Sequence, residues 1–435
     1  MYKDIRDYGI IGNLRSAALV GLDGSVDWAP APYMDSPSVF AAILDDKKGG
    51  HWSIAPVAEH ESNQHYIAET NILVTEFQAQ DAVITLTDYI PAKGGQGKKQ
   101  SDLQEIQEKA EIHRKVTCTK GSCEVKMECM PKFDYARGET KLTHVPEGIL
   151  AEHEKGGLGV LVSKQQIEIQ DNKAISVFTL KQGESAYFAF HYHNVVAEEL
   201  KDEHYEREIE ETKTFWEGWV HRCDWDSCLI QYPWHEYVLR SSLVLKILFF
   251  EPPGSVAAAA TTSLPESIGG ERNWDYRFSW IRDSAFTVQA LFWLGYLKEA
   301  NAYVKWLVFE CQHLNPESPG SLQIMYGLQG QTTLVEETLD HLDGYKGSKP
   351  VRIGNGAYNQ KQWDVYGSLF NTIWQLHIRE SHIVDEELWK GLRALANHVV
   401  ATWKEPDEGI WEVRGSAKRF VHSAVMCWVA LDRAI

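Results

Sequence analysis

The chain has 435 residues, of which 44% are hydrophobic, and this is enough for a sizeable core in two or three domains. Lys and Arg number 43 and Asp and Glu number 61, which gives a formal net charge of −18. An acidic chain is poorly suited to the backbone of nucleic acid or to an anionic membrane surface, whereas it suits a neutral ligand. We therefore expect no nucleic-acid or membrane partner, and the sequence leaves the oligomeric state open.

The start of the chain, its hydropathy and its cysteines favour a cytoplasmic protein. Residues 1–21 lack the apolar core and cleavage site of a signal peptide, and no later segment reaches transmembrane length without charges. The seven cysteines follow no regular framework and predict reduced, buried thiols. Cys223 and Cys228 have no second Cys/His pair at zinc spacing nearby, and we expect neither a metal nor another cofactor.

The first part of the chain has a strand-like pattern. Short runs rich in β-branched and aromatic residues predict strands at 72–78, 82–90, 159–164, 166–170, 175–180 and 185–193. Their close spacing and the GG, DN and QG breaks between them predict an antiparallel β-sandwich over residues 1–194. His191 and His193 would share one face of the last strand. Because no third ligand is visible, a solvent-facing pair is favoured over a metal site.

Helical patterns follow the strands. Residues 195–220 are highly charged and end in Trp216 and Trp219, which predicts a linker helix (assigned to 195–225) that is solvated along most of its length and docked at its end. Further helices are predicted at 231–250, 281–298, 300–314, 363–379, 385–403 and 420–435. Segment 385–403 is apolar on one face, whereas 281–298 is apolar almost all round. This alternation predicts two layers of helices over residues 226–435.

Two long connections between these helices carry polar and aromatic side chains together. In residues 269–286, Ser279 could cap the next helix, with Asp283 in its first turn. Alternatively, the neighbouring Arg282 and Asp283 could hold two adjacent hydroxyls of a pyranose beside aromatic residues such as Trp280. Residues 337–367 mix Arg, Asn, Gln, Asp, Trp and Gly without a phosphate-loop pattern, which favours a neutral polyhydroxylated ligand.

A third loop, PDEGIWEVRG at 406–415, offers a candidate acid. Glu405, Asp407 and Glu408 surround a proline and are most simply solvated turn residues. Glu412 follows Ile410 and Trp411, and burial against a Trp would raise the pKa of its carboxyl and keep it protonated at neutral pH, as a general acid requires. The alternative is a structural Glu at a helix entry, bonded to Arg414.

Taken in order, several motifs resemble glycoside hydrolase family 15, the glucoamylase family, in its bacterial and archaeal glucoamylase/trehalase-like branch. They are DYGIIGNLRSAALVGLDGSVDW, GGERNWDYRFSWIRD, HLDGYKGSKPVRIGN, QKQWDVYG and GIWEVRG. The resemblance implies an N-terminal β-sandwich followed by an (α/α)6 toroid. It also implies inverting hydrolysis that releases glucose from the non-reducing end of α-glucosides such as maltooligosaccharides or trehalose.

The resemblance assigns roles to individual residues. Glu412 matches the general acid, and Arg282 and Asp283 match the pair that grips the terminal glucose. The other implied substrate-binding residues are Trp280, Trp411, Arg352, Gln362 and Asp364. Val413 stands where fungal glucoamylases carry a second carboxylate, so the choice between trehalose and maltooligosaccharides stays open.

Two parts of the family pattern are not found in this sequence. The toroid needs twice the number of helices predicted here, and no carboxylate matches the general base, which the family places in a loop before the last helix. We therefore expect a C-terminally truncated chain that holds about the first half of the toroid and is inactive alone. The alternative is a non-catalytic carbohydrate-binding or regulatory protein on the same scaffold.

Overall fold

The computed structural model describes residues 2–93, 110–192, 201–220, 233–313, 321–379, 384–412 and 414–435, without the side chains of residues 308–313. The chain forms two compact units. The first comprises Met1–Ile247, Ser263–Asn273 and Leu339–Val351, and the second comprises Leu248–Thr262, Trp274–Thr338 and Arg352–Ile435.

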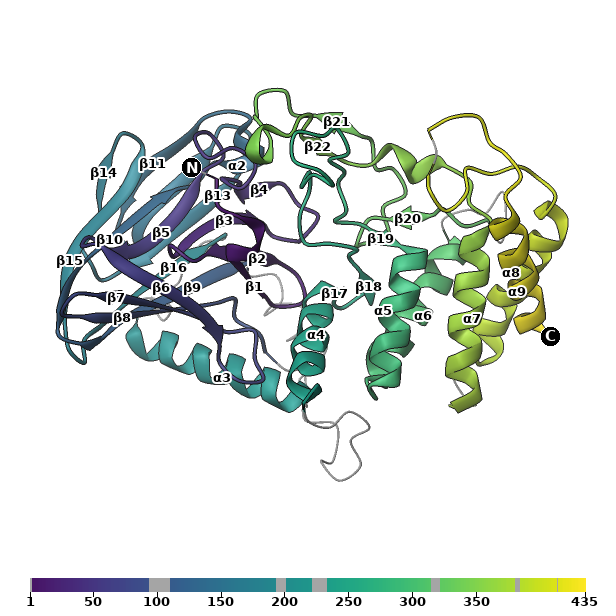
Figure 1. Ribbon diagram of the computed structural model, residues 1–435, viewed down its shortest axis with the longest axis horizontal. Helices are drawn as coiled ribbons and strands as arrows, with labels where there is room; N and C mark the ends of the chain where they lie inside the picture. The colour runs from purple at the N-terminus through teal and green to yellow at the C-terminus, as the bar shows by residue number, and fades with distance from the viewer. Residues whose placement is uncertain are drawn as a thin grey trace. The chain divides into compact units, whose positions relative to one another are not determined.

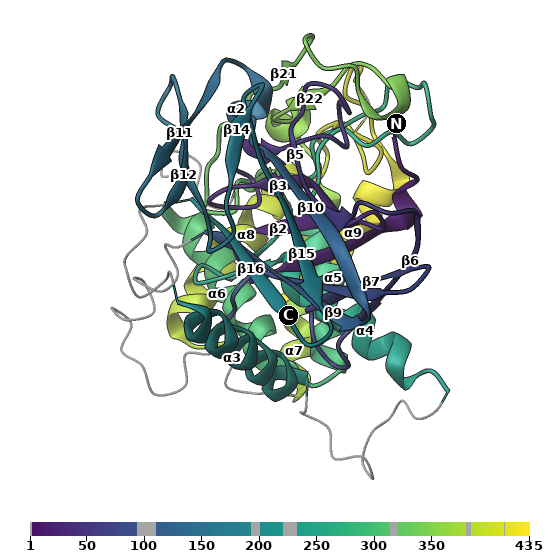
Figure 2. The same cartoon turned by 90° about the vertical axis from the view of Figure 1, so that its left-hand side faces the viewer.

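The first unit contains two eight-stranded antiparallel sheets (Figures 1 and 2). One has the strand order β1-β2-β3-β5-β10-β15-β14, with β4 paired to β3, and the other has the order β11-β12-β13-β16-β9-β8-β7-β6. Their bounds are β1 (Tyr8–Gly12), β2 (Ala17–Gly21), β3 (Ser25–Pro30), β4 (Ser38–Phe40), β5 (His51–Pro56), β6 (His60–Tyr66), β7 (Leu73–Ala79), β8 (Val83–Tyr89), β9 (Glu111–Lys120), β10 (Ser122–Met130), β11 (Thr140–Val145), β12 (Gly148–His153), β13 (Leu158–Ser163), β14 (Glu168–Gln170), β15 (Lys173–Lys181) and β16 (Ser185–His191). The antiparallel strands expected from the alternating pattern are confirmed.

A buried ion pair lies in the apolar core between these two sheets. Arg114 of β9 donates from Nε to Asp88 Oδ1 of β8 at 2.7 Å, and both side chains are fully buried. Its other donors reach across to the backbone oxygens of Trp52, in β5 of the facing sheet, and of Gly24, just before β3. The guanidinium therefore satisfies carbonyls at the centre of the sandwich as well as a carboxylate.

The expected linker helix is docked more extensively than its charge predicted. Helix α3 (Asp202–Val220) buries residues along its whole length, beginning with His204 and Tyr205. The Tyr89 hydroxyl donates to the backbone oxygen of Tyr205 at 3.1 Å, and Tyr187 of β16 stacks on the Tyr205 ring. The solvated-linker prediction is wrong because buried residues recur at intervals of three or four along α3, including Glu208, Thr212 and Trp216.

The two units do not follow the predicted division at residues 194 and 225. Helix α4 (His235–Leu248), expected in the helical domain, starts in the first unit, where Asn71 Nδ2 donates to Leu243 O at 3.2 Å. Residues 339–351 also belong there, since Tyr345 donates to Lys3 O at 2.9 Å. The first unit further contains the short helix α2 (Phe133–Ala136).

The second unit contains α5 (Ile281–Trp293), α6 (Leu297–His313), α7 (Asp364–Arg379), α8 (Glu386–Thr402) and α9 (Val421–Ala434). Short strand pairs join them: β17 (Phe249–Phe250) with β18 (Ser255–Val256), β19 (Ser279–Trp280) with β20 (Met325–Tyr326), and β21 (Glu337–Thr338) with β22 (Arg352–Ile353). The predicted helices are confirmed, but the one expected at 281–298 ends at 293. Gly295 has a φ of +90° there, a conformation that suits glycine and breaks the helix.

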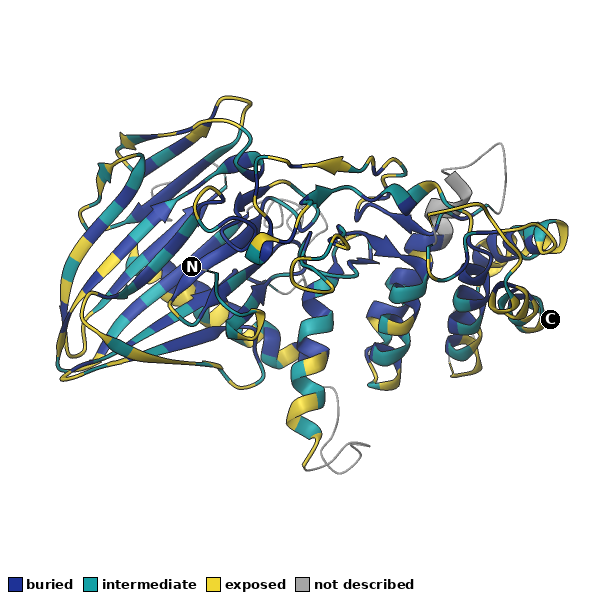
Figure 3. Ribbon diagram, turned by 45° about the horizontal axis from the view of Figure 1, so that its top comes forward, coloured by how far each residue is buried: buried dark blue, intermediate teal, exposed yellow. Residues whose placement is uncertain are grey.

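The helices of this unit pack in two rows. α7 contacts α5 on one side and α9 on the other, while α6 contacts α5 and α8. A Cβ on Gly367 of α7 would lie 2.4 Å from the Met426 oxygen of α9, so the last residue of the WDVYG motif permits this close approach. Buried residues, dark blue in Figure 3, accordingly lie along facing sides of neighbouring helices.

The N-cap residue of α8 should contribute to the stability of the helical unit, and this can be tested. Asp385 accepts from the Leu388 amide at 2.8 Å, satisfying one of the free donors at the start of the helix. Asp385→Ala should lower the free energy of unfolding by about 0.5–2 kcal/mol, measured by urea denaturation. Lys390→Ala, on the exposed face of the same helix, should change it by less than about 0.5 kcal/mol. Equal stabilities of the two variants would contradict the capping role.

The reduced, buried thiols expected from the sequence are found for the cysteines whose side chains the structure describes. Cys118, Cys123, Cys129 and Cys427 are free and buried, whereas Cys223, Cys228 and the Cys311 side chain lie outside the described residues. Within the described part of the chain, no helix is both long enough and apolar enough to cross a bilayer.

Candidate active site

Glu412, the candidate acid, lies in a tight turn that follows Gly409. Its amide donates to the Gly409 oxygen at 3.1 Å, and its own φ is +51°, in the left-handed region that non-glycine residues rarely occupy. Such a conformation costs about 1–3 kcal/mol and persists only where the surrounding structure holds it. The turn is therefore held in place by contacts with neighbouring segments.

These contacts come from the residues just before Glu412. Asp407 Oδ2 accepts from the Trp363 amide at 3.0 Å and from the Ser423 hydroxyl at 2.7 Å, which joins the loop to the residue before α7 and to the first turn of α9. Glu408 accepts from the Lys361 amide at 2.8 Å. Asp407 was expected to be a solvated turn residue, and this is wrong because its carboxylate is the buried acceptor for two elements.

The side chain that contacts the Glu412 carboxyl is Trp280. Its indole Nε1 donates to Glu412 Oε1 at 2.8 Å, and Arg282 Nη2 lies 3.7 Å from the same oxygen. Arg282 also donates to the Ile410 oxygen at 3.3 Å, which fixes it beside the turn. Residues 280–282, at the start of α5, thus meet the 409–412 turn.

The sequence suggested Ser279 as the cap of the helix that became α5, and the structure differs. Trp280, not Ser279, is the N-cap residue of α5, and no side chain caps the helix. The Ser279 hydroxyl instead contacts the Ser284 hydroxyl at 3.2 Å. Asp283 lies in the first turn as expected, and its carboxylate is 3.4 Å from Arg282. Both residues of the proposed sugar-binding pair therefore lie beside Glu412.

The environment of Glu412 favours its protonated form. Burial raises the pKa of this carboxyl above its ordinary value, and the negative charge of Asp283 adds to the effect. The Trp280 hydrogen bond, Arg282 and Gln362 act in the opposite direction without cancelling the burial effect. The sequence attributed this burial to Trp411, which is wrong, because Trp411 is 85% exposed. The indole against Glu412 comes from 132 positions earlier in the chain.

Two further predicted site residues lie close by. Gln362 and Asp364 are both buried, and Asp364 is the first residue of α7. Burial raises the pKa of Asp364, while the charges of Arg282 and His422 oppose this rise. The site therefore combines a buried acid with amide, guanidinium and carboxyl groups, which are suited to the hydroxyls of a neutral sugar.

Arg352 lies in a second cluster that contains a carboxylate not identified from the sequence. Glu336 accepts from Arg414 Nη2 at 2.6 Å and from the Gly356 amide at 2.9 Å, and Arg352 Nε lies 3.4 Å from its other oxygen. Trp274 has the Arg352 and Arg414 guanidiniums 4.3 and 4.2 Å from its ring centroid. Burial would raise the pKa of Glu336, but the Arg414 and Gly356 hydrogen bonds outweigh it and the pKa is lowered.

This cluster decides one alternative left open by the sequence. Arg414 was considered as a partner that would make Glu412 structural, but its hydrogen bonds go to Glu336. Glu412 and Glu336 have opposite pKa shifts, so one carboxyl holds its proton more tightly than usual and the other less. The two carboxyl groups therefore lie in different electrostatic environments. Val413, between Glu412 and Arg414 in the loop, lies outside the described residues.

Comparison with known families divides the chain into two matches. Residues 233–435 match glycosyl hydrolases family 15, and residues 3–175 match the trehalase-like N-terminal family. A trehalase of Mycolicibacterium smegmatis is 34% identical over 99% of this chain and 66% of its own length. A trehalase of Mycobacterium tuberculosis is 34% identical over 99% of this chain and 64% of its own.

A trehalase of Thermoplasma acidophilum is 35% identical, with 96% of this chain and 68% of the relative covered. The chain thus spans about two thirds of the length of these curated relatives. Among solved structures, a putative kojibiose phosphorylase from the human microbiome covers 90% of the chain at 10% identity and a TM-score of 0.47, a likeness too distant to assign an architecture.

Proposed function

Because the chain belongs to glycosyl hydrolase family 15, we propose that it hydrolyses a terminal α-linked glucoside, with trehalose as the substrate and Glu412 as the general acid. The observation that carries the assignment is the hydrogen bond between Trp280 and the buried Glu412 carboxyl, beside Arg282. It joins two segments far apart in sequence around one group with a raised pKa.

The proposed reaction begins with protonation. Glu412 gives its proton to the glycosidic oxygen as the bond from this oxygen to the anomeric carbon breaks. Arg282 and Asp283 hold hydroxyls of the glucose that carries positive charge in the transition state. A water molecule attacks the anomeric carbon from the opposite face, which inverts its configuration, and a second carboxylate accepts the water proton. We assign no residue of this chain as that base.

We also propose that the helical unit is part of an (α/α)6 toroid. The support is the packing of α5, α7 and α9 in one row and of α6 and α8 in a second row. In such a toroid the loops at one end of the inner helices surround the substrate. The turn before α9 that carries Glu412 and the start of α5 that carries Trp280 meet in this way.

Trehalose is favoured over maltooligosaccharides because the relatives covering most of this chain are named trehalases. The test is glucose release by the full-length gene product from trehalose, maltose, isomaltose and soluble starch. Preferential hydrolysis of trehalose is expected. Preference for maltose or starch would make the protein glucoamylase-like, and sugar binding without hydrolysis would support a non-catalytic function.

The Trp280 contact predicts a change in pH dependence. A general acid works while protonated, so kcat falls as pH rises through the pKa of Glu412. Trp280→Phe removes a hydrogen bond that lowers this pKa, and the alkaline limb of the kcat profile should therefore move to higher pH. Trp363→Phe is the matched control, because the Trp363 indole donates to the Glu405 oxygen instead. An unmoved limb in Trp280→Phe would contradict the assigned contact.

A further inference from the structure

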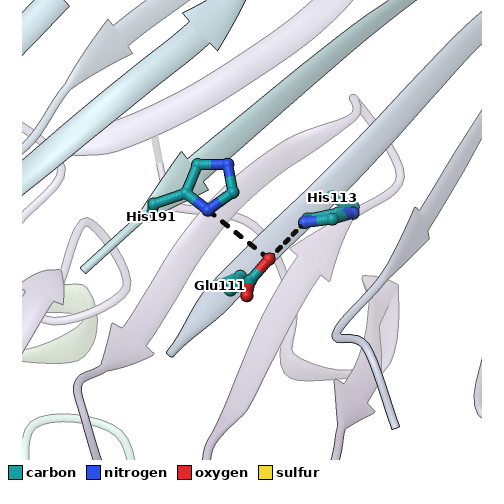
Figure 4. A group of neighbouring side chains, drawn as sticks. All are labelled: Glu111, His113 and His191. Carbon is teal, nitrogen blue, oxygen red and sulfur yellow. Dashed lines mark hydrogen bonds and ion pairs between the residues drawn. The ribbon is translucent and has the colours of Figure 1, made fainter. Parts of the chain in front are cut away.

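Three side chains outside the candidate active site converge on the outer face of the second sheet. Glu111 and His113 lie on β9, and His191 lies on β16 directly opposite Glu111 in the strand register. One donor atom from each residue lies within 4.8 Å of the others, and Figure 4 shows both imidazoles directed at the carboxylate. The solvent-facing expectation for His191 is wrong because this residue has 0% exposure, whereas His193 lies outside the described residues.

The distances place both rings on a single carboxylate oxygen. His113 Nε2 is 2.7 Å from Glu111 Oε2, and His191 Nδ1 is 3.4 Å from the same atom. Residue 189, opposite His113 in the register, is an alanine, which leaves space on this face between the two histidines. The sheet register, rather than a flexible loop, therefore brings the three groups together.

The hydrogen bonds of Tyr89 determine which His113 nitrogen carries a proton. Tyr89 donates its hydroxyl hydrogen to the Tyr205 oxygen at 3.1 Å, and its hydroxyl oxygen is 3.2 Å from His113 Nδ1. With its only proton given to Tyr205, this oxygen accepts from Nδ1–H.

With Nδ1 directed at Tyr89, Nε2 is the His113 nitrogen that faces the Glu111 oxygen and can ligate a metal ion. Two lone pairs at 2.7 Å repel one another unless a positive species lies between or beside them. A single proton could join His113 to Glu111, but it would not also serve His191, which is directed at the same oxygen. A metal ion can be shared by all three donors.

We propose that Glu111, His113 and His191 form a binding site for a divalent transition-metal ion, and that Zn²⁺ is the ion their donors fit best. Two imidazoles and one carboxylate match the ligand preferences of zinc, and they leave one position of a tetrahedral ion open. The Tyr89 hydroxyl supplies the outer hydrogen bond that orients a ligating histidine.

The site has a structural role in the first unit. Its ligands join β9 to β16, and through Tyr89 it is linked to the Tyr205 backbone of α3. Bound metal should therefore strengthen the docking of α3 on the sheet. All these residues belong to the first unit, whereas Glu412 belongs to the second, so the proposal does not depend on the glycosidase function.

The test measures metal content and thermal stability in the full-length protein. The protein is stripped with chelator, incubated with Zn²⁺ alone, passed through a desalting column and analysed for zinc, and its melting temperature is followed with and without the ion. About one retained zinc per chain and a higher melting temperature are expected. Glu111→Gln and His191→Ala should lose both effects, and His65→Ala, at an exposed histidine of β6, should keep them.

Tyr89→Phe provides a variant that leaves the ligands in place. It removes the outer hydrogen bond and should weaken Zn²⁺ binding about 10–100-fold in competition with a coloured chelator. The proposal is overturned if the wild-type protein retains no zinc, which would leave a shared proton between Glu111 and His113. It is also overturned if Glu111→Gln and His191→Ala retain zinc as the wild type does.

Discussion

Replacing Glu412 by Gln is expected to lower kcat for trehalose hydrolysis by the full-length protein by about 10²–10⁴-fold. Gln has nearly the same shape, and its amide oxygen can still accept the Trp280 hydrogen bond that holds the side chain. It cannot, however, deliver a proton to the glycosidic oxygen. The binding groups Arg282 and Asp283 are unchanged, so KM should change much less than kcat.

Glu408→Gln is the matched control for this substitution. Glu408 lies in the same loop and pairs with the Lys361 amide, remote from the Trp280 contact. It should retain nearly full kcat. Near-wild-type activity in Glu412→Gln, or an equal loss in both variants, would show that Glu412 is not the proton donor.

Replacing Arg114 by Met is expected to lower the free energy of unfolding of the first unit by about 3–5 kcal/mol. The substitution leaves Asp88 and two backbone carbonyls buried without their donors. Burial already raises the pKa of Asp88 despite Arg114, and the carboxyl would take up a proton without its partner. Denaturant unfolding followed by circular dichroism measures the loss.

Lys115→Met is the control for Arg114→Met. Lys115 is the next residue of β9, on the opposite face, and its partly exposed ammonium pairs with Glu206. Surface pairs of this kind contribute about 0–1 kcal/mol, so this variant should remain close to wild type. An Arg114→Met protein as stable as Lys115→Met would contradict the central role given to the buried pair.

Local periodicity predicted the helices and six of the sixteen strands that the structure describes in the two sheets. Strands in the first unit and helices in the second follow directly from the change between alternation and spacings of three and four residues. The pattern did not show that Gly295 ends a helix within an otherwise apolar run, because its effect depends on a positive φ. It also misjudged α3, whose charged sequence contains enough apolar and aromatic residues for docking.

The candidate site was harder to predict because its contacts are long-range. The motif resemblance pointed to Glu412, Arg282 and Trp280, and the structure brings these three together. The carboxyl of Asp407 and the cluster around Glu336 depend on partners dozens of residues away, which spacing along the chain does not reveal. For the same reason, Trp411 appeared to bury Glu412 because it is the adjacent residue, although its ring is exposed.

The leaving group of the substrate tests the role of Glu412 most directly. A general acid matters when the departing oxygen needs a proton, as in trehalose, and matters little when the leaving group departs as a stable anion. We therefore expect Glu412→Gln to lose most of its kcat on trehalose while retaining nearly wild-type turnover of α-glucosyl fluoride. A similar loss of activity on both substrates would contradict the assignment of Glu412 as the proton donor.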